Sequence, residues 1–95
     1  MTCNLSDCEL QILYIFYSNR NFRISSGYHS DKLKKIIEKK FPGEYHESIG
    51  HLKNLGCIAE IRKKEIKYYI ADIPNVIKLL GAHGYNVTKG NIFKL

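Results

Sequence analysis

The segment HLKNLGCIAEIRKKEIKYYIAD, residues 51–72, changes its hydrophobic period part-way along its length. Apolar residues recur at helical spacing up to Gly56, and beyond it they alternate as in a strand on both sides of the basic cluster 62–64. Glycine is common just after a helix because it adopts the left-handed conformation without strain. The segment therefore predicts a helix that leads directly into an antiparallel β-hairpin with a basic tip.

The alternation also predicts a register for this hairpin, with Lys63 and Lys64 at the tip. The apolar face would pair Ile61 with Ile66, Ala59 with Tyr68 and Cys57 with Ile70. The other face would pair Glu60 with Lys67 and Arg62 with Glu65, and opposite charges directly across from each other stabilise antiparallel strands. Two lysines suit a two-residue turn poorly because such turns need positive φ, so we expect a four-residue loop in the same register, or a bulge.

A first helix is expected from the capping box Ser6–Glu9 to about Ser18. Its body is apolar on nearly every side, so it should be buried on more than one side, under the C-terminal segment or a second copy of the chain. The following residues, 20–26, are polar and rich in turn formers, which indicates a loop or one very short strand.

A second helix is expected over residues 31–41, with Ser30 as its N-cap and Pro42-Gly43 as its stop. Its apolar stripe comprises Leu33, Ile36, Ile37 and Phe41. Its open side carries a lysine ridge, which consists of Lys32, Lys35 and Lys39. A ridge of this kind either contacts an anionic partner or is an ordinary solvated face.

The helix that precedes the hairpin is expected over residues 44–55. The side chains that share its apolar face are Tyr45, Ile49, Leu52 and Leu55, and those on the opposite face are His46, Glu47, Gly50, His51, Lys53 and Asn54. A fourth helix should begin at Asp72 and end near Gly81 or Gly84. Residues 85–95 are expected to form a second small hairpin or a flexible end.

Three helices followed by strand, turn and strand resemble the winged helix-turn-helix. Residues 51–72 in particular are similar to the helix-to-wing segment of the ArsR, MarR and PadR repressors, in which a His-Leu-x-x-Leu run ends in glycine and passes into a basic hairpin. The resemblance implies an α+β fold with a three-helix core, a two-stranded wing and a C-terminal helix. It implies a single domain over residues 1–95, with a core at 5–72 and residues 73–95 available for dimerisation.

The same resemblance implies that the helix 44–55 enters the major groove and that the wing 62–65 contacts the minor groove or the backbone. The implied DNA contacts are His46, Glu47, Gly50, His51, Lys53 and Asn54 on the helix and Arg62, Lys63, Lys64 and Lys67 on the hairpin, and the lysine ridge adds Lys32, Lys35 and Lys39. The chain departs from the family in the acidic Glu44 and Glu47 at the start of this helix and in the absence of arginine from it.

The charge distribution favours the same class of partner. The net charge is +6, residues 19–40 contribute +5 and residues 60–67 contribute +2, whereas residues 1–18 contribute −2. Phosphate neutralisation by basic side chains and base contacts from one helix would suit a DNA-binding transcriptional regulator that acts on double-stranded DNA as a homodimer. The alternative is a protein-interaction module of the same fold in a transcription, replication or viral complex, which would use the apolar first helix and the tail.

Other classes of function receive little support from the sequence. Cys3, Cys8 and Cys57 form no CxxC pair, and His46 and His51 are five residues apart, so neither a disulfide framework, a metal site nor catalysis is expected. No cofactor or small-molecule ligand is indicated. No secretory leader is expected, and no apolar run reaches about 18 residues, so a soluble cytoplasmic protein is expected, with no contact to a membrane.

Overall fold

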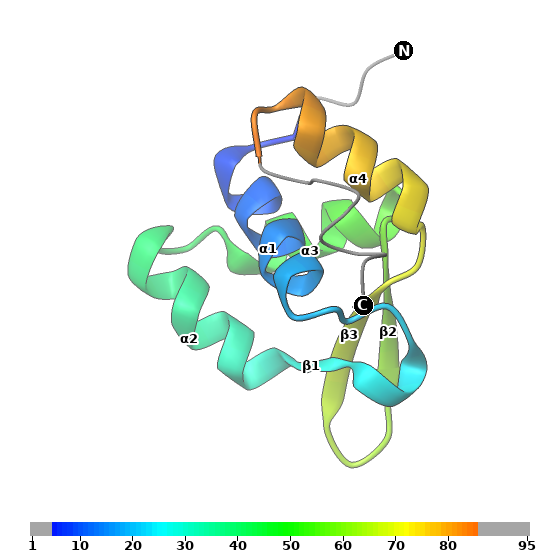
Figure 1. The fold of residues 1–95 in the computed structure, drawn as a ribbon. Coiled ribbons are helices and arrows are strands. Elements are labelled where there is room, and N and C mark those ends of the chain that lie inside the picture. Colours follow the sequence, from blue (N-terminus) through cyan, green and yellow to red (C-terminus); the bar gives the residue numbers. More distant parts are fainter. Residues whose placement is uncertain (1–4, 86–95) are drawn as a thin grey trace.

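A computed structural model describes residues 5–85 of the chain, which fold into an α+β arrangement (Figure 1). The elements in chain order are α1 (Asp7–Ser18), the 3-10 turn η1 (Ile24–Ser26), β1 (Tyr28–His29), α2 (Ser30–Lys40), α3 (Tyr45–Asn54), β2 (Ile58–Arg62), β3 (Ile66–Ile70) and α4 (Ile73–Ala82). The predicted order of three helices, a hairpin and a further helix is confirmed. The prediction for residues 86–95 lies outside the described residues.

α1 begins at the predicted capping box and is the central helix of the molecule. The backbone N–H of Ser6 donates to Glu9 Oε1 at 2.8 Å, and the N–H of Glu9 donates to Ser6 Oγ at 3.2 Å. The helix contacts α2, α3, α4 and β3, and Figure 1 shows α4 across its upper side. The all-round apolar surface is thus buried on several sides as predicted, with α4 from the same chain as one cover.

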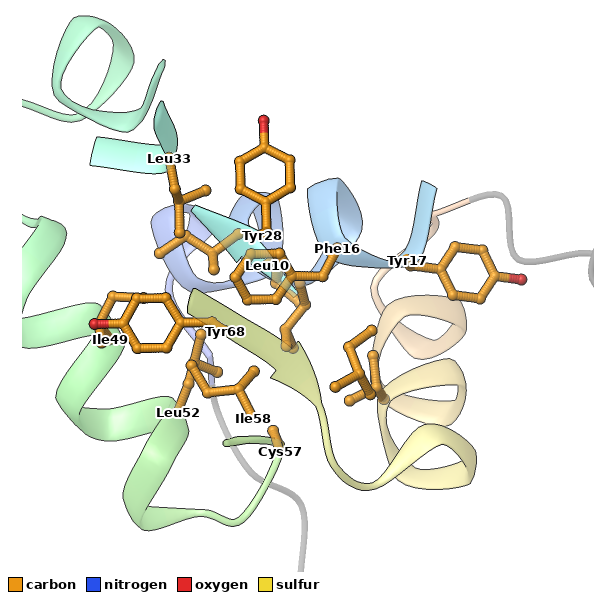
Figure 2. Packing of buried hydrophobic residues seen from close by; sticks show 14 of the residues in the cluster. Leu10, Phe16, Tyr17, Tyr28, Leu33, Ile49, Leu52, Cys57, Ile58 and Tyr68 are labelled. Atoms are coloured by element: carbon orange, nitrogen blue, oxygen red, sulfur yellow. The ribbon is translucent and has the colours of Figure 1, made fainter. Parts of the chain in front are cut away.

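The core forms where α1 meets the sheet (Figure 2). Phe16 is fully buried, and the centroid of its ring lies 5.8 Å from that of Tyr28 on β1 and 6.4 Å from that of Tyr68 on β3. Leu33 from α2 and Leu52 from α3 are also fully buried in this cluster. These ring contacts join α1 to the sheet. Replacing a buried phenylalanine by alanine typically lowers the free energy of unfolding by about 3–5 kcal/mol, so Phe16 is important for stability.

The sheet has three antiparallel strands in the order β1-β3-β2. Tyr28 lies opposite Tyr68, and His29 lies opposite Lys67. The predicted two-stranded wing therefore gains a third strand, which begins two residues after the segment that we predicted as a loop or short strand. Two residues are too few for strand alternation to be visible in a sequence, and β1 forms because the outer edge of β3 offers it backbone partners.

The predicted hairpin register is wrong by one residue. Ile58 lies opposite Ile70, and Arg62 lies opposite Ile66, so the connection contains three residues instead of two or four. Side chains on a strand alternate between faces, and the shift therefore moves every residue of β2 to the opposite face from the one predicted. Glu60 lies across from Tyr68 on the face toward the helices, and Ile61 lies across from Lys67 on the outer face.

α2 also departs from two predictions. The helix begins at Ser30, after His29 as N-cap, and no side chain caps it, so the prediction of Ser30 as N-cap is wrong. His29 is held in the β1–β3 pairing, which sets where the helix starts. Leu33 and Ile37 are buried as predicted, but Ile36 is 40% exposed, and the apolar stripe is narrower than the sequence indicates.

The ends of α3 and α4 follow the sequence more closely. Gly56 follows α3 with φ of +77°, the left-handed conformation that the sequence predicts there. Asp72 caps α4 through its Oδ1, which accepts the N–H of Asn75 at 3.3 Å. Within residues 5–85, no helix is long and apolar enough to cross a membrane.

Candidate nucleic-acid interface

α3 is attached to the core by one face and leaves the other open. Tyr45, Ile49 and Leu52 are buried, as their spacing predicts. The side chains on the open face are His46, Glu47, His51, Lys53 and Asn54, all exposed, and the half-buried Gly50 lies among them. A Cβ added at Gly50 would have no atom within 4 Å, so the helix is open to close approach at that point.

Buried tyrosines hold α3 in place against its neighbours. The hydroxyl of Tyr45 donates to the backbone oxygen of Ser30 at the start of α2, at 3.3 Å. Burial, and then the neighbouring Tyr68, raise the pKa of Tyr45 far above its ordinary value. Burial likewise raises the pKa of Tyr68. Both phenols therefore stay neutral, and α3 has a fixed position between α2 and the sheet.

His51 is joined to α1. Its Nδ1 hydrogen-bonds with Oε2 of Glu9, whose side chain is only 7% exposed. The other oxygen of this carboxylate accepts the N–H of Ser6, so both oxygens of Glu9 have partners. The sequence identified Glu9 only as part of the capping box, and nothing in its spacing from His51 indicated this contact.

Glu60 connects α3 to the hairpin. Its Oε1 accepts a hydrogen bond from Lys53 Nζ at 2.8 Å, and its Oε2 accepts one from Arg62 Nε. The hydrogen bond from Lys53, and then that from Arg62, lower the pKa of this carboxyl below its ordinary 4.5. Because the observed register turns Glu60 toward α3, two of the predicted DNA contacts form one ion-pair cluster. The predicted pairing of Glu60 with Lys67 is wrong.

The start of α3 is acidic. Glu44 and Glu47 line a small hollow of about 250 Å³ together with Glu9 and His51. Glu47 was predicted as a DNA contact, and its carboxylate is exposed beside this hollow. Phosphates would be repelled here, so the second half of α3 is the part that suits an anionic partner.

The hairpin tip, unlike the start of α3, is basic. Lys63 and Lys64 are exposed at the turn, and together with residues from β2, β3 and the segment around η1 they line a groove of about 840 Å³. The lining residues are Arg23, Ser25, Ile61, Lys63, Lys64, Glu65 and Lys67. Oε2 of Glu65, the acid among these residues, lies 3.0 Å from Nδ1 of His29.

The lysine ridge is exposed along α2. Lys32 Nζ lies 5.5 Å from the centre of the Tyr28 ring, so the ridge starts beside β1. Figure 1 shows α2 running from β1 away from the hairpin, and Lys39 therefore lies at the far end. The structure joins Lys53 and Arg62 through Glu60, and Arg62 directly precedes the tip lysines, whereas the ridge lies on a separate helix.

Sequence reasoning missed Arg23 and Ser25 of the groove and the partner roles of Glu9 and Glu60. The basic character of residues 19–40 was a signal for Arg23, but only the fold shows that this segment lies against the hairpin.

Among residues 5–85, no three histidine, cysteine, aspartate or glutamate side chains gather in a way that could hold a metal ion. Cys8 and Cys57 are buried in the core, where Asn75 Nδ2 donates to Cys57 Sγ at 3.9 Å, and burial raises the pKa of Cys8.

Comparison of the chain with known protein families, with curated proteins and with solved structures gives no match. Function is therefore inferred from the residues of the site and their arrangement alone.

Proposed function

We propose that this chain is a winged helix-turn-helix domain that binds double-stranded DNA and regulates transcription. The order α1, β1, α2, α3, β2, β3 and the strand order β1-β3-β2 are consistent with that fold. α3 would be the recognition helix, and the β2–β3 hairpin would be the wing.

The observation that carries the proposal is the ion-pair cluster of Lys53, Glu60 and Arg62. It joins the exposed side of α3 to the last residue of β2, next to the tip lysines. A helix and a basic ribbon are thus parts of one continuous polar surface. The major groove is about 12 Å wide and admits a helix, so a surface of this kind suits a duplex.

In this proposal, phosphate contacts and base contacts come from different residues. Lys63 and Lys64 at the tip neutralise backbone phosphates, which supplies affinity for any sequence. Asn54, exposed near the end of α3, is suited to pair with adenine through its side-chain amide. Since Glu44 and Glu47 make the start of α3 acidic, the helix would meet the duplex with its second half, from Gly50 onward.

We propose that the DNA-binding form is a homodimer that uses α1 and α4. Apolar side chains on these helices remain partly exposed, namely Tyr14, Ile15, Ile73, Ile77 and Leu79. The ring centroid of Tyr85 lies 5.1 Å from that of Tyr14, so the aromatic patch continues past the end of α4. Two-fold symmetry would place two α3 helices on half-sites about one helical turn, roughly 34 Å, apart.

The same patch and the acidic start of α3 favour a second candidate function, a protein-interaction module without direct DNA binding. The salt dependence of duplex binding separates the two candidates. A domain that neutralises several phosphates loses affinity steeply as salt rises, with a slope of about 0.9 in log K for each contact. A module that binds only proteins has no such slope.

The test is a mobility-shift titration of the full chain against random duplex at two salt concentrations, beside a mass measurement of the free protein. We expect binding that weakens at least tenfold between about 50 and 200 mM salt, since two or more phosphate contacts give a slope of about 1.8 or more, and a mass of twice the monomer. Absence of duplex binding at the lower salt would reject the DNA-binding proposal. A monomer mass with retained binding would reject only the dimer.

A further inference from the structure

The segment between α1 and β1 is fixed in position over the hairpin. Asn21 is 7% exposed, and its Nδ2 donates to the backbone oxygen of Ser26 at 2.5 Å. The backbone oxygen of Asn21 accepts the N–H of Ile70 at 2.7 Å, and the N–H of Ser26 donates to the oxygen of Arg23 at 3.1 Å. These bonds anchor the η1 turn to the end of β3, so Arg23 and Ser25 sit on a turn that is anchored at both ends.

Gly27 allows this turn to approach the hairpin closely. A Cβ at this position would lie 2.9 Å from Lys67 Cβ and 3.3 Å from Ile61 Cδ1. Both of those residues are on the outer face of the hairpin, the face turned away from α3. A side chain at position 27 would push the η1 turn away from the sheet. Glycine therefore allows Arg23 and Ser25 to stay close to the hairpin.

The lining of this groove carries more cations than acids. Within the described part of the chain, Arg23, Lys63, Lys64 and Lys67 form no ion pair. Glu65 is the acid in the lining, so the groove presents an excess of positive charge. Lys53 and Arg62, on the inner side of the hairpin, differ because both are bound to Glu60.

The shape of the groove suits an extended anionic chain better than a single small anion. Its lining combines the cations Arg23, Lys63, Lys64 and Lys67 with the apolar side chain of Ile61. A volume of about 840 Å³ is large for one phosphate. A chain of alternating phosphate and sugar groups would offer charge to the cations and apolar surface to Ile61.

We propose that this groove between η1 and the hairpin binds the phosphodiester backbone of duplex DNA, with Arg23 and Lys67 as its principal ligands. The site lies on the face of the hairpin opposite α3, so DNA contacts the hairpin on both faces and at its tip. The proposal deepens the DNA-binding function and rests on it. It assigns a binding role to Arg23 and Ser25, which lie outside the helix-and-wing surface.

The test compares two double variants that each remove two positive charges. Arg23→Gln with Lys67→Gln removes both charges from the groove and keeps part of each aliphatic stem. Lys34→Gln with Lys40→Gln changes exposed lysines of α2 that neither line the groove nor belong to the lysine ridge. Duplex affinity is measured over a salt series for the parent and both variants, and thermal unfolding establishes that each is folded.

We expect the groove variant to lower the salt slope by about 2 and to bind roughly fiftyfold more weakly at about 0.1 M salt, since each phosphate contact contributes about 0.9 to the slope. The control variant should stay close to the parent. If replacing Lys67 unfolds the chain, Arg23→Gln alone, at an exposed position, should show about half the change in slope.

Equal binding by the groove and control variants would overturn the groove proposal and leave the DNA-binding function intact. A parent that binds no duplex would overturn both. In the folded parent, duplex should also shift the backbone amide resonances of Ser25 and Ile61, and unchanged resonances at these two positions would contradict the groove site.

Discussion

The exposed side of α3 and the outer side of the hairpin carry similar residue types but use their charges differently. On α3, Lys53 is bound to Glu60, His51 is bound to Glu9, and acids stand at the start of the helix. On the hairpin, the lysines at the tip and in the groove have no ion pair within residues 5–85. An exposed basic residue is therefore not always free to bind an anionic partner, because an acid in the same protein can already be paired with it. The hairpin should supply most of the affinity for DNA, and α3 should supply selectivity.

The largest effect is expected from Lys63→Ala with Lys64→Ala. Losing two unpaired cations should weaken duplex binding about fiftyfold at roughly 0.1 M salt and lower the salt slope by about 2, equally for all sequences. A salt series with two unrelated duplexes measures both quantities. If this variant binds as the parent does at every salt concentration, the hairpin tip does not contact DNA.

A smaller and more selective effect is expected from Asn54→Ala. One lost base contact is worth about 1–3 kcal/mol, so affinity for the preferred duplex should fall roughly tenfold and affinity for random duplex should barely change. Selection from a duplex pool by parent and variant measures the preference. An unchanged preference would remove α3 from the base-reading role.

His51→Gln is the control for Asn54→Ala, because it changes another exposed polar residue of α3. It leaves the buried carboxylate of Glu9 without its ring partner, which should lower the free energy of unfolding by about 1 kcal/mol. We expect little change in sequence preference because His51 is bound to α1. A changed preference with unaltered stability would show that this ring reads bases after all.

Glu60→Gln should make the cations beside α3 available to DNA, as those of the hairpin tip are. It removes the carboxylate that is bound to Lys53 and Arg62. One additional phosphate contact is worth about eightfold at roughly 0.1 M salt, so duplex binding should tighten severalfold. A salt series on this variant measures the gain. Weaker binding would mean instead that Glu60 holds the two cations in the geometry that DNA requires.

The same variant has an expected pH dependence. The folded-state pKa of Glu60 lies below the ordinary 4.5, so its carboxylate contributes stability above that pH, and the contribution is lost as the pH falls through the folded-state value. Glu60→Gln should therefore be less stable than the parent at pH 7, and the difference should shrink at pH 3. Urea unfolding at both pH values measures this difference.

The smallest effect is expected from Gly50→Ala. No atom lies within 4 Å of the added Cβ, so the helix should gain about 0.5–1 kcal/mol of stability. If α3 enters a groove at Gly50, duplex binding should weaken at the same time. Gly27→Ala is the matched control, and the contact of 2.9 Å with Lys67 Cβ should make it destabilising by about 1–3 kcal/mol. Urea unfolding and duplex titration of both variants measure these changes.

Features that depend on short stretches of chain could be predicted from the sequence. The capping box at Ser6, the glycine at the end of α3 and the cap at Asp72 are all present as expected. Each of these involves groups within about one helical turn, so the residue types by themselves specify the contact.

The hairpin register was not determined in this way, because Cys57 and Ile58 are both apolar and either of them can pair with Ile70. Adjacent apolar residues satisfy two registers of β2, and packing in the core selected the one that places the buried Ile58 opposite Ile70. That selection moved Glu60 toward Lys53 and left Lys67 on the outer face.

By itself, the sequence determined the caps of α1 and α4, the glycine at the end of α3, that a basic hairpin follows α3, and which residue types could meet DNA. Only the tertiary structure decided which of those side chains already have partners, as His51 has in Glu9, 42 residues apart. It also decided that the segment before β1 lies over the hairpin. The reason is that an ion pair between distant residues depends on strand register and helix packing, which the whole core sets together.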